Sequence, residues 1–302
     1  MKEEILHIKS ISQLHELSGF SKPKHPLISI IDVSQWEITE EMVNVKMSSN
    51  LYAIGLKDKS CGVQYGRNHY DFDEGVLFFT APHQVQKVVK TQKKNQVHGW
   101  MLFFHPDLIR NTSLGNIIDA YGFFSYDVYE ALHLSDAEQN SINDCLRLIK
   151  NEIDERIDNH SQNVIVSSLE LLLNLSNRYY ERQFNTRSAH NSDVLTRFQG
   201  QLKEYYSNGQ FAADGQPTIN YFAAKANLSA NYFSDLLKKE TGYSAKDFLN
   251  NFIVEKAKTL LLSENETISS IAYNLGFNYP HYFSRLFKVK TGMTPQEYRQ
   301  LN

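Results

Sequence analysis

Two sets of polar and charged residues recur about fifty positions apart in the sequence, and their types are those that hydrogen-bond to the edges of nucleic acid bases. Within each set the residues follow the three- and four-residue spacing of one helix face. Arginine commonly contacts guanine through two hydrogen bonds, and a carboxylate accepts one from cytosine N4. On the helices predicted below, the apolar residues are expected to face the core, so these polar residues are left facing outward as candidates for contact with bases. These are Asn231, Ser234, Asp235 and Lys238 in the first set and His281, Ser284, Arg285 and Lys288 in the second.

Two of these residues leave alternatives open. Arg285 is the strongest candidate for base recognition, although a guanidinium also suits a phosphate contact or an ion pair. Asp235 suits cytosine, and equally it would neutralise the neighbouring Lys238 or Lys239. A substitution that changes the base preference distinguishes base recognition from the other roles.

The elements that position these residues form a duplicated unit, with one copy over residues 218–248 and the other over residues 267–298. In the first copy the apolar residues between Ile219 and Ala226 have the spacing of a helix with one buried face. We expect each copy to be a helix, a turn and a second helix. A plain helical hairpin shares this pattern, but two copies in register favour a DNA-binding helix–turn–helix.

The turns and the helix crossings carry the residue types that this motif requires. Asn227 and Gly276 stand where the chain must turn, and both residue types tolerate positive φ. Alanine stands at the expected close approach of the two helices in both copies, as Ala223 and Ala272. Both features support the duplicated motif.

The second helix of each copy is expected to begin near Ser229 in the first copy and near Asn278 in the second, because both residue types are good N-caps. In the second copy either Tyr282 or Phe283 is expected to be buried.

A single helix over Ser244–Leu262 is expected to join the two copies, with Ser244 and Asp247 forming an approximate capping box. Such a helix is about 28 Å long. Successive major-groove faces on one side of B-DNA are separated by roughly 34 Å. One chain is therefore expected to place two recognition helices in adjacent grooves.

Residues 193–302 resemble the DNA-binding domain of the AraC/XylS transcription regulators. The resemblance rests mainly on the second copy, with milder departures at Asn227 and Leu237 in the first. It implies that six of the residues above face the bases or the groove of the DNA, and that RNA polymerase is a partner. The six are Asn231, Ser234, Asp235, His281, Ser284 and Arg285. The matching segments are Ile271-Ala272, Leu275-Gly276-Phe277, Tyr282 through Lys288, Thr291-Gly292, Thr294-Pro295 and Tyr298-Arg299.

The net charge of the whole chain is −3, whereas DNA-binding proteins are often basic. From residue 193 onward, however, there are 12 Lys and Arg against 10 Asp and Glu, which is a net charge of +2. We expect the second recognition helix to supply much of the attraction to phosphate, and DNA affinity to depend on salt. Its basic residues, with no acid between them, are His281, Arg285, Lys288 and Lys290.

The first 134 residues contain short apolar or alternating runs bounded by turn residues, which predicts many short strands in a sandwich or barrel. Residues 65–77 resemble half of a cupin-like β-barrel, the domain that often binds a small effector in AraC-like regulators. The expected strands are Leu27–Val33, Val43–Met47, Leu51–Leu56, Val76–Thr80, Val85–Lys90 and His98–Phe104.

Five aromatic residues on or near these strands are candidates for an effector pocket, although for most of them an ordinary barrel core is the favoured interpretation. Period-two alternation does not indicate which face is inward. The candidates are Tyr52, Tyr65, Phe78, Trp100 and Phe103.

The histidines of this region do not have the spacing of a metal site, so we expect no metal and no cofactor. An enzymatic cupin needs His-x-His and an acid, whereas the sequence has His69-Tyr70-Asp71. His98 and His105 lie seven positions apart, which is not a chelating spacing in itself. His83 is expected to be an ordinary core or surface residue.

Residues 135–184 are expected to form two amphipathic helices, the first with a capping box at Ser135 and Glu138. In the family such helices pair two subunits, so we expect a homodimer, with Leu169 and Leu172 in its leucine-rich seam. The alternative is that the helices pack only on their own barrel. Residues 185–192 are polar and aperiodic, and we expect a flexible linker there.

The prediction is an α+β protein: a cupin-like β-barrel effector domain (1–134), a helical dimerisation segment (135–184), a linker (185–192) and an all-α domain with two helix–turn–helix copies joined by a long helix (193–302). It is expected to be a cytoplasmic transcription regulator, an activator that binds double-stranded DNA under control of a small effector, and not an enzyme. Two cysteines, no signal peptide and no membrane-length apolar run agree with this. The alternatives are a helical interaction adaptor or a cupin-type enzyme with an accessory DNA-binding domain.

Overall fold

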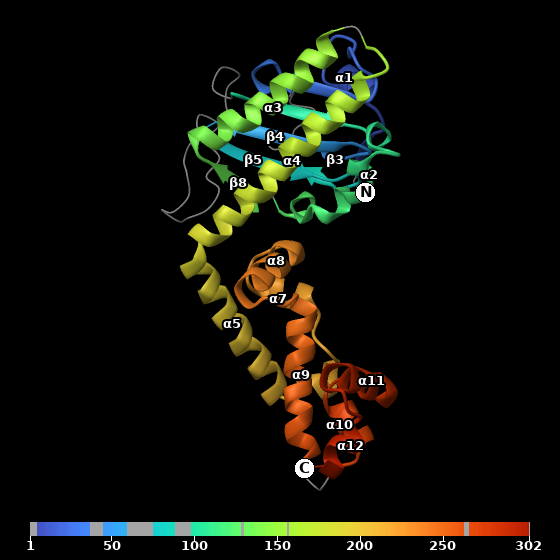
Figure 1. Ribbon diagram of the computed structural model, residues 1–302, viewed down its shortest axis with the longest axis vertical. Helices are drawn as coiled ribbons and strands as arrows, with labels where there is room; N and C mark the ends of the chain where they lie inside the picture. The colour runs from blue at the N-terminus through green and yellow to red at the C-terminus, as the bar shows by residue number, and fades with distance from the viewer. Residues whose placement is uncertain are drawn as a thin grey trace. The chain divides into compact units, whose positions relative to one another are not determined.

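The computed structural model describes residues 5–36, 45–58, 75–87, 98–127, 130–155, 157–262 and 266–301. The chain divides into two compact units, an N-terminal unit over Met1–Thr186 and a C-terminal unit over Arg187–Asn302 (Figure 1). No helix in the described ranges is both long enough and apolar enough to cross a membrane.

The N-terminal unit contains two β-sheets. The larger sheet is antiparallel, with its five strands in the order β2-β7-β4-β5-β8, and the smaller has three strands in the order β1-β3-β6. The strands of the larger sheet are β2 (Ile28–Asp32), β4 (Tyr52–Asp58), β5 (Gly75–Thr80), β7 (Gly99–Phe104) and β8 (Leu132–Leu134). Those of the smaller sheet are β1 (Ile5–Ile8), β3 (Lys46–Ser49) and β6 (Gln86–Lys87).

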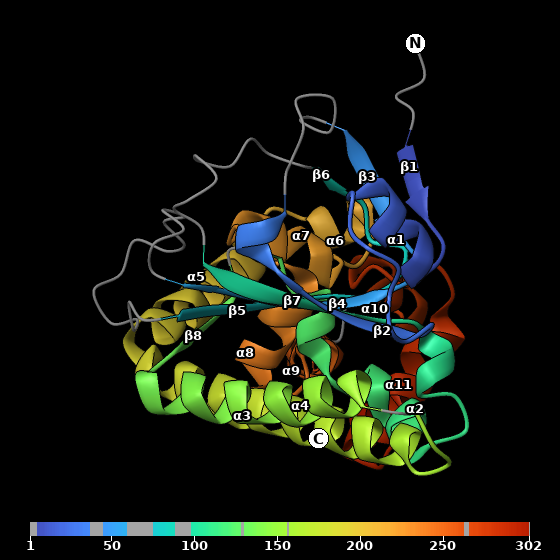
Figure 2. The same ribbon diagram turned by 90° about the horizontal axis from the view of Figure 1, so that it is seen from above.

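The larger sheet is covered on both faces (Figure 2). Helices α3 (Asp136–Asp154) and α4 (Ser161–Thr186) lie on one side. The smaller sheet and α1 (Ile11–Leu17) lie on the other side, where a shared apolar core holds them to the larger sheet. That core consists of Ile8, Ile11, Leu14, Ile31, Leu51, Ala53 and Phe103.

The predicted β-barrel is not closed in the described residues, in which the strands form two separate sheets that pack through side chains. Four of the six predicted strands agree with β2, β4, β5 and β7, apart from shifts of one or two residues at their ends. The predicted strands Val43–Met47 and Val85–Lys90 coincide with β3 and β6 only over residues 46–47 and 86–87, and residues 43–44 and 88–90 lie outside the described ranges. Strands β1 and β8 and helix α1 were not expected. Because both faces of the larger sheet are buried, the apolar pattern predicts strands without showing whether the sheet closes on itself.

The helix pair α3–α4 packs closely and begins as the sequence predicts. Ser135 Oγ accepts from the Glu138 backbone N–H at 3.4 Å, and Glu138 Oε2 accepts from the Ser135 backbone N–H at 2.9 Å. The same glutamate pairs with Arg182 of α4 at 2.8 Å, which ties the end of one helix to the start of the other. Short 3₁₀ turns between β7 and β8 complete this side of the sheet, and α2 (Ser113–Ile117) lies among them.

Residues 185–192 were predicted to be a flexible linker, but they are helical except for Arg187. Helix α4 continues to Thr186 and α5 begins at Ser188, and the boundary between the two units falls at this break. Asn, Ser and Thr cost only tenths of a kcal/mol in a helix, a cost that packing readily outweighs. The buried side chains of Phe184, Asn191 and Val194 supply that packing.

The C-terminal unit is all helical in the described residues, and α9 is the long helix that joins its two parts (Figure 1). Phe198 of α5 lies at the centre of the first part, with its ring 4.9 Å from Phe222 and 5.3 Å from Phe233. The helices are α5 (Ser188–Ser207), α6 (Gln210–Asp214), α7 (Ile219–Lys225), α8 (Ala230–Thr241), α9 (Ala245–Leu261), α10 (Ile268–Asn274), α11 (Pro280–Thr291) and α12 (Pro295–Leu301).

Candidate DNA-binding interface

The two predicted helix–turn–helix copies are present, as α7–α8 and α10–α11, and their turns have the same backbone geometry. Asn227 has φ +54° and Gly276 has φ +78°, so both predicted turn positions are confirmed. The Leu228 N–H donates to Ala223 O at 2.9 Å, and the Phe277 N–H donates to Ala272 O at 3.0 Å.

The close helix crossings in both copies depend on alanine. Ala223 and Ala272 are fully buried, as their expected position at the crossings requires. A longer side chain at either position would push the two helices apart.

The second helix of each copy, which we call the recognition helix, starts differently in the two copies. Ser229 is the N-cap of α8 and accepts from the Tyr232 N–H at 3.2 Å, as predicted. In the second copy the N-cap lies one residue after the predicted Asn278, because Tyr279 holds that position and Pro280 begins the helix. Proline at the first helical position favours this start, since its φ is already helical and the missing N–H would have no partner there.

The two recognition helices end in the same way. Thr241 Oγ1 donates to Leu237 O at 2.7 Å, and Thr291 Oγ1 donates to Phe287 O at 2.8 Å. In both copies a glycine follows with φ near +80° and closes the helix, and its N–H bonds to the carbonyl oxygen four residues earlier. The C-terminal ends of the two recognition helices are therefore held by the same set of local bonds.

The structure places each predicted set on the side of its recognition helix away from the core, and the corresponding positions are similarly exposed. The core-facing residues are buried, notably Phe233 and Leu237 of α8 and Phe283 and Phe287 of α11. Exposed side chains are Asn231, Lys238, His281, Arg285 and Lys288, and half-buried ones are Ser234, Asp235 and Ser284.

Two exposed tyrosines lie at the start of α11; Tyr279 was expected only near the entry of the second set, and Tyr282 was not expected to face outward. Tyr279 is 59% exposed and Tyr282 is 55% exposed, and both rings gather around His281. The centroid of the His281 ring lies 4.1 Å from that of Tyr282. The sequence left Tyr282 and Phe283 as alternatives for the core, and the structure assigns the core position to Phe283. The sequence does carry a sign of an exposed ring here: two aromatic residues are adjacent, and only one of them can face the core.

Lys290 was expected to join the basic cluster, but the structure pairs it with an acid 43 positions earlier. Its Nζ lies 2.8 Å from Asp247 Oδ1, and the same carboxylate accepts from Ser244 Oγ at 2.8 Å, at the start of α9. Lys290 is thus paired with an acid, whereas Arg285 and Lys288 are exposed cations of α11 that form no ion pair with a described residue. Asp247 connects the linker helix to the second recognition helix.

This pairing predicts a pH dependence of stability. The hydrogen bond from Lys290, with a second one from Ser244, lowers the pKa of Asp247 below its ordinary value. A carboxylate with a lowered folded-state pKa contributes its full stability above the ordinary pKa and loses that contribution as the pH falls through the lowered one. We therefore expect Asp247→Asn to reduce the loss of stability on acidification, measured as the thermal midpoint against pH.

Lys290→Met provides the matched control, because it removes the other partner and is expected to reduce the acid sensitivity in the same way. Thermal midpoints of Asp247→Asn and wild type that fall in parallel on acidification would show that the contact contributes nothing to stability.

Comparison with known proteins supports what the geometry indicates. A helix–turn–helix domain family matches residues 222–301. The transcriptional regulator YfiF of Bacillus subtilis is 25% identical over 243 residues, which cover 78% of this chain and 72% of YfiF. The transcriptional activator RhaR of Yersinia pestis is 37% identical over 79 residues, which are 26% of this chain and 27% of RhaR. The C-terminal unit is an AraC-type helix–turn–helix domain.

Solved structures are also similar to parts of this chain. The C-terminal domain of the response regulator AraT from Geobacillus stearothermophilus is 31% identical and covers 36% of this chain and 85% of its own, with a TM-score of 0.32. The chain spans only about a quarter of the length of RhaR.

The aromatic residues predicted to line one effector pocket lie on opposite faces of the larger sheet. Side chains in register across antiparallel strands share a face, and Tyr52 pairs with Phe104 while Trp100 pairs with Leu56. Both therefore lie on one face, where the Trp100 Nε1–H donates to Asn143 of α3 at 2.9 Å. Phe103 belongs to the core on the opposite side, so the predicted single pocket is wrong.

Phe78 shares the face of Phe103. It pairs in register with Gly55, as does Met101, and the Phe78 ring lies directly over that glycine. Tyr65 lies outside the described residues. The same holds for His69, which was predicted not to bind a metal. No group of three or more potential metal ligands comes together in the described ranges.

Proposed function

We propose that this chain is a sequence-specific DNA-binding transcription regulator in which both recognition helices contact one DNA site. The observation that supports this most strongly is the match in exposure between the two copies. In each copy, polar side chains cover the face of the recognition helix opposite the core, and a lysine near the C-terminal end, Lys238 or Lys288, is exposed. A hairpin with only a structural role has no need of such a repeated polar face.

The linker helix sets the separation of the two copies. Helix α9 has 17 residues, which corresponds to about 26 Å. One helical turn of B-DNA is roughly 34 Å. The recognition helices therefore fit adjacent major grooves if the DNA bends modestly toward the protein, and such bending costs on the order of 1–6 kcal/mol.

Arg285 and Lys288 are proposed to act differently on DNA. Arg285 is exposed, and no acidic side chain in the described part of the chain pairs with it, which favours a role at the DNA. We expect Arg285→Ala to weaken binding to the cognate site by about 1–3 kcal/mol and to relax the preference at one base pair. Lys288→Ala should weaken binding to all DNA sequences alike and reduce the dependence of DNA affinity on salt concentration.

Selection of binding sites from random DNA, followed by gel-shift titration at several salt concentrations, measures both effects. An unchanged base preference in Arg285→Ala would assign this residue to the phosphate backbone. The same experiment separates a regulator from a helical adaptor, because an adaptor selects no DNA sequence.

We also propose that the N-terminal unit binds a small effector and that the protein activates transcription through contact with RNA polymerase in the cytoplasm. RhaR, to which the C-terminal domain is similar, is named a transcriptional activator. The effector site that we propose is the side of the larger sheet that bears Phe78 and Phe103, next to the smaller sheet. Trp36 lies against Phe103 there, and its buried Nε1 has no hydrogen-bond partner in the described protein. A thermal-shift screen of metabolites on the full chain tests this proposal.

A homodimer through the outer face of α3 and α4 is part of the proposal, but the seam is not the predicted one. Leu169 and Leu172 are fully buried inside their own unit. The exposed apolar side chains of the two helices are Leu148, Val164 and Leu171, which are 51%, 42% and 49% exposed. Exposed leucines and valines on adjacent helices suit contact with a second copy of the same face.

We expect Leu171→Glu to raise the dimer dissociation constant at least tenfold without unfolding the chain, because a charge would be buried in the interface without a partner. Sedimentation velocity over a range of concentrations measures this. Asn177→Glu, which adds the same charge at an exposed position of α4, is the control and should leave the dimer intact. A Leu171→Glu protein that associates like the wild type would place the dimer interface elsewhere.

A further inference from the structure

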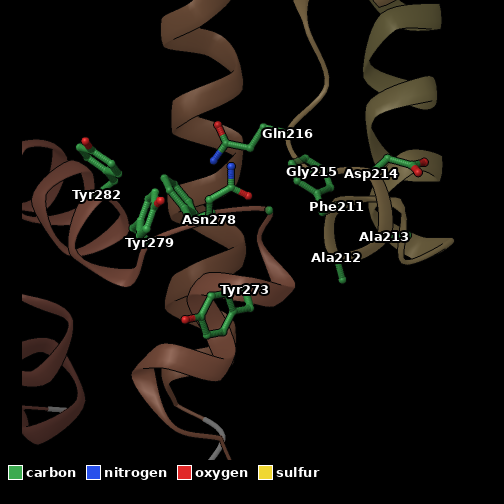
Figure 3. A pocket seen from close by; sticks show the side chains of 12 residues that line it. Phe211, Ala212, Ala213, Asp214, Gly215, Gln216, Tyr273, Asn278, Tyr279 and Tyr282 are labelled. Atoms are coloured by element: carbon green, nitrogen blue, oxygen red, sulfur yellow. The ribbon is translucent and has the colours of Figure 1, made fainter.

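An open cleft of about 660 Å³ lies beside the turn of the second helix–turn–helix copy (Figure 3). One wall is the end of α6 with the residues that follow it, and the other wall is the turn of the second copy with the start of α11. This volume lies within the range of small-molecule sites in proteins. The side chains that matter for its chemistry are Gln216, Tyr273, Asn278, Tyr279 and Tyr282.

Two carboxamide groups supply hydrogen-bonding capacity to the cleft. Gln216 Nε2 is buried and has no hydrogen-bond partner in the described part of the protein. The side chains of Gln216 and Asn278 point into the same space in the middle of the cleft (Figure 3). A carboxamide offers two donors and an acceptor, so this pair can bind a ligand edge that carries both kinds of group.

Three tyrosine rings supply stacking surfaces. Tyr273, Tyr279 and Tyr282 are 53%, 59% and 55% exposed, which is unusual for large aromatic side chains that line one cleft. Bases stack on such rings, and each stacked base contributes substantially to binding regardless of its identity.

The lining of the cleft offers no positively charged side chain to an anionic ligand. None of the described lining residues is a lysine or an arginine, and the one ionisable acid among them is Asp214. Its carboxylate points away from the two amides (Figure 3). A phosphate or carboxylate would find no counter-charge here, whereas a neutral ligand does not need one.

We propose that this cleft binds a neutral purine base or nucleoside. The ring would stack on a tyrosine at the start of α11, and its edge would bond to Gln216 and Asn278. Carboxamides are the side chains that pair with adenine through N6 and N7. Because Tyr279 and Tyr282 adjoin His281, an occupied cleft changes DNA affinity, and this second step alone rests on the proposed function.

Isothermal titration calorimetry of the full chain without DNA tests the site, with adenosine, adenosine monophosphate and choline as probes. We expect saturable binding of one adenosine per chain, weaker binding of the monophosphate and no binding of choline. Gln216→Met and Tyr279→Ala should each weaken adenosine binding roughly tenfold or more. Tyr243→Ala is the matched control, because Tyr243 is 53% exposed, lies outside the cleft and should not affect adenosine binding.

The variants are chosen so that folding does not confound the result. Gln216→Met removes a donor without a protein partner, and Tyr279 is exposed, so both proteins should keep the thermal midpoint of the wild type. If Gln216→Met unfolds, Asn278→Ala at an exposed position replaces it. The proposal is overturned if adenosine gives no saturable heat, if both cleft variants bind it normally, or if choline binds more tightly. Loss of DNA binding would not affect any of these measurements.

Discussion

Replacing Gly276 with alanine is expected to destabilise the second helix–turn–helix copy by about 2–4 kcal/mol. Gly276 has φ +78°, a conformation that side chains with a Cβ adopt only with strain. A Cβ here would also lie 2.8 Å from the backbone N of Gln216 and 2.9 Å from Phe211 O. Both neighbours are backbone atoms, which cannot rotate away as a side chain can. Hydrogen exchange of peptides from α10 and α11 measures the loss.

Gly242→Ala and Gly292→Ala separate the two causes. Both glycines have positive φ, +76° and +82°, but a Cβ at either would meet nothing within 4 Å. The free energy of unfolding of each of these variants should therefore fall by only about 1 kcal/mol, which is the cost of the left-handed conformation. If all three alanine variants lost the same amount of stability, the close approach between the turn of the second copy and the end of α6 would contribute nothing to the effect of Gly276→Ala.

Inserting five base pairs between the two half-sites of the DNA target is expected to reduce affinity roughly a hundredfold, the equivalent of one to two mismatched base pairs or more. Half a helical turn places the second groove on the opposite face of the duplex. Helix α9 joins the two copies directly and cannot follow that rotation, because Leu249, Ile253 and Ala257 are buried along it. Fluorescence anisotropy with labelled duplexes measures the change.

The same five base pairs placed outside the site are the control and should leave affinity unchanged. Equal affinity for the duplex with the insertion between the half-sites and the duplex with the insertion outside the site would mean that a single recognition helix binds DNA. Footprinting on the unmodified site should show two protected major-groove segments about ten base pairs apart.

Local features of the helix–turn–helix copies could be predicted from the sequence because each depends on a few neighbouring residues. A positive φ at Asn227 and Gly276 and the N-cap at Ser229 follow from residue type and position. The start of α11 was misplaced by one residue because Asn278 is the better cap, whereas Pro280 sets where the helix begins.

Features that depend on distant pairing could not be predicted in this way. Asp247 and Lys290 are 43 positions apart, and nothing in the local pattern pairs them. The face of an aromatic residue on the larger sheet depends on register and on what covers each side. Since both sides are buried, Trp100 and Phe103 look alike in sequence but lie on opposite faces.

The matching ends of the two recognition helices bear on how this regulator can change over evolutionary time. The bonds of Thr241 and Thr291 and the glycines after them involve backbone and inner positions, so they place no demand on the outer residues of either helix. Substitutions on the outer face of one recognition helix therefore leave the bonds that hold that helix unchanged, and they leave the other copy unchanged as well. A protein built in this way can acquire a new target sequence one half at a time, and it keeps the contacts of the other half while it does so.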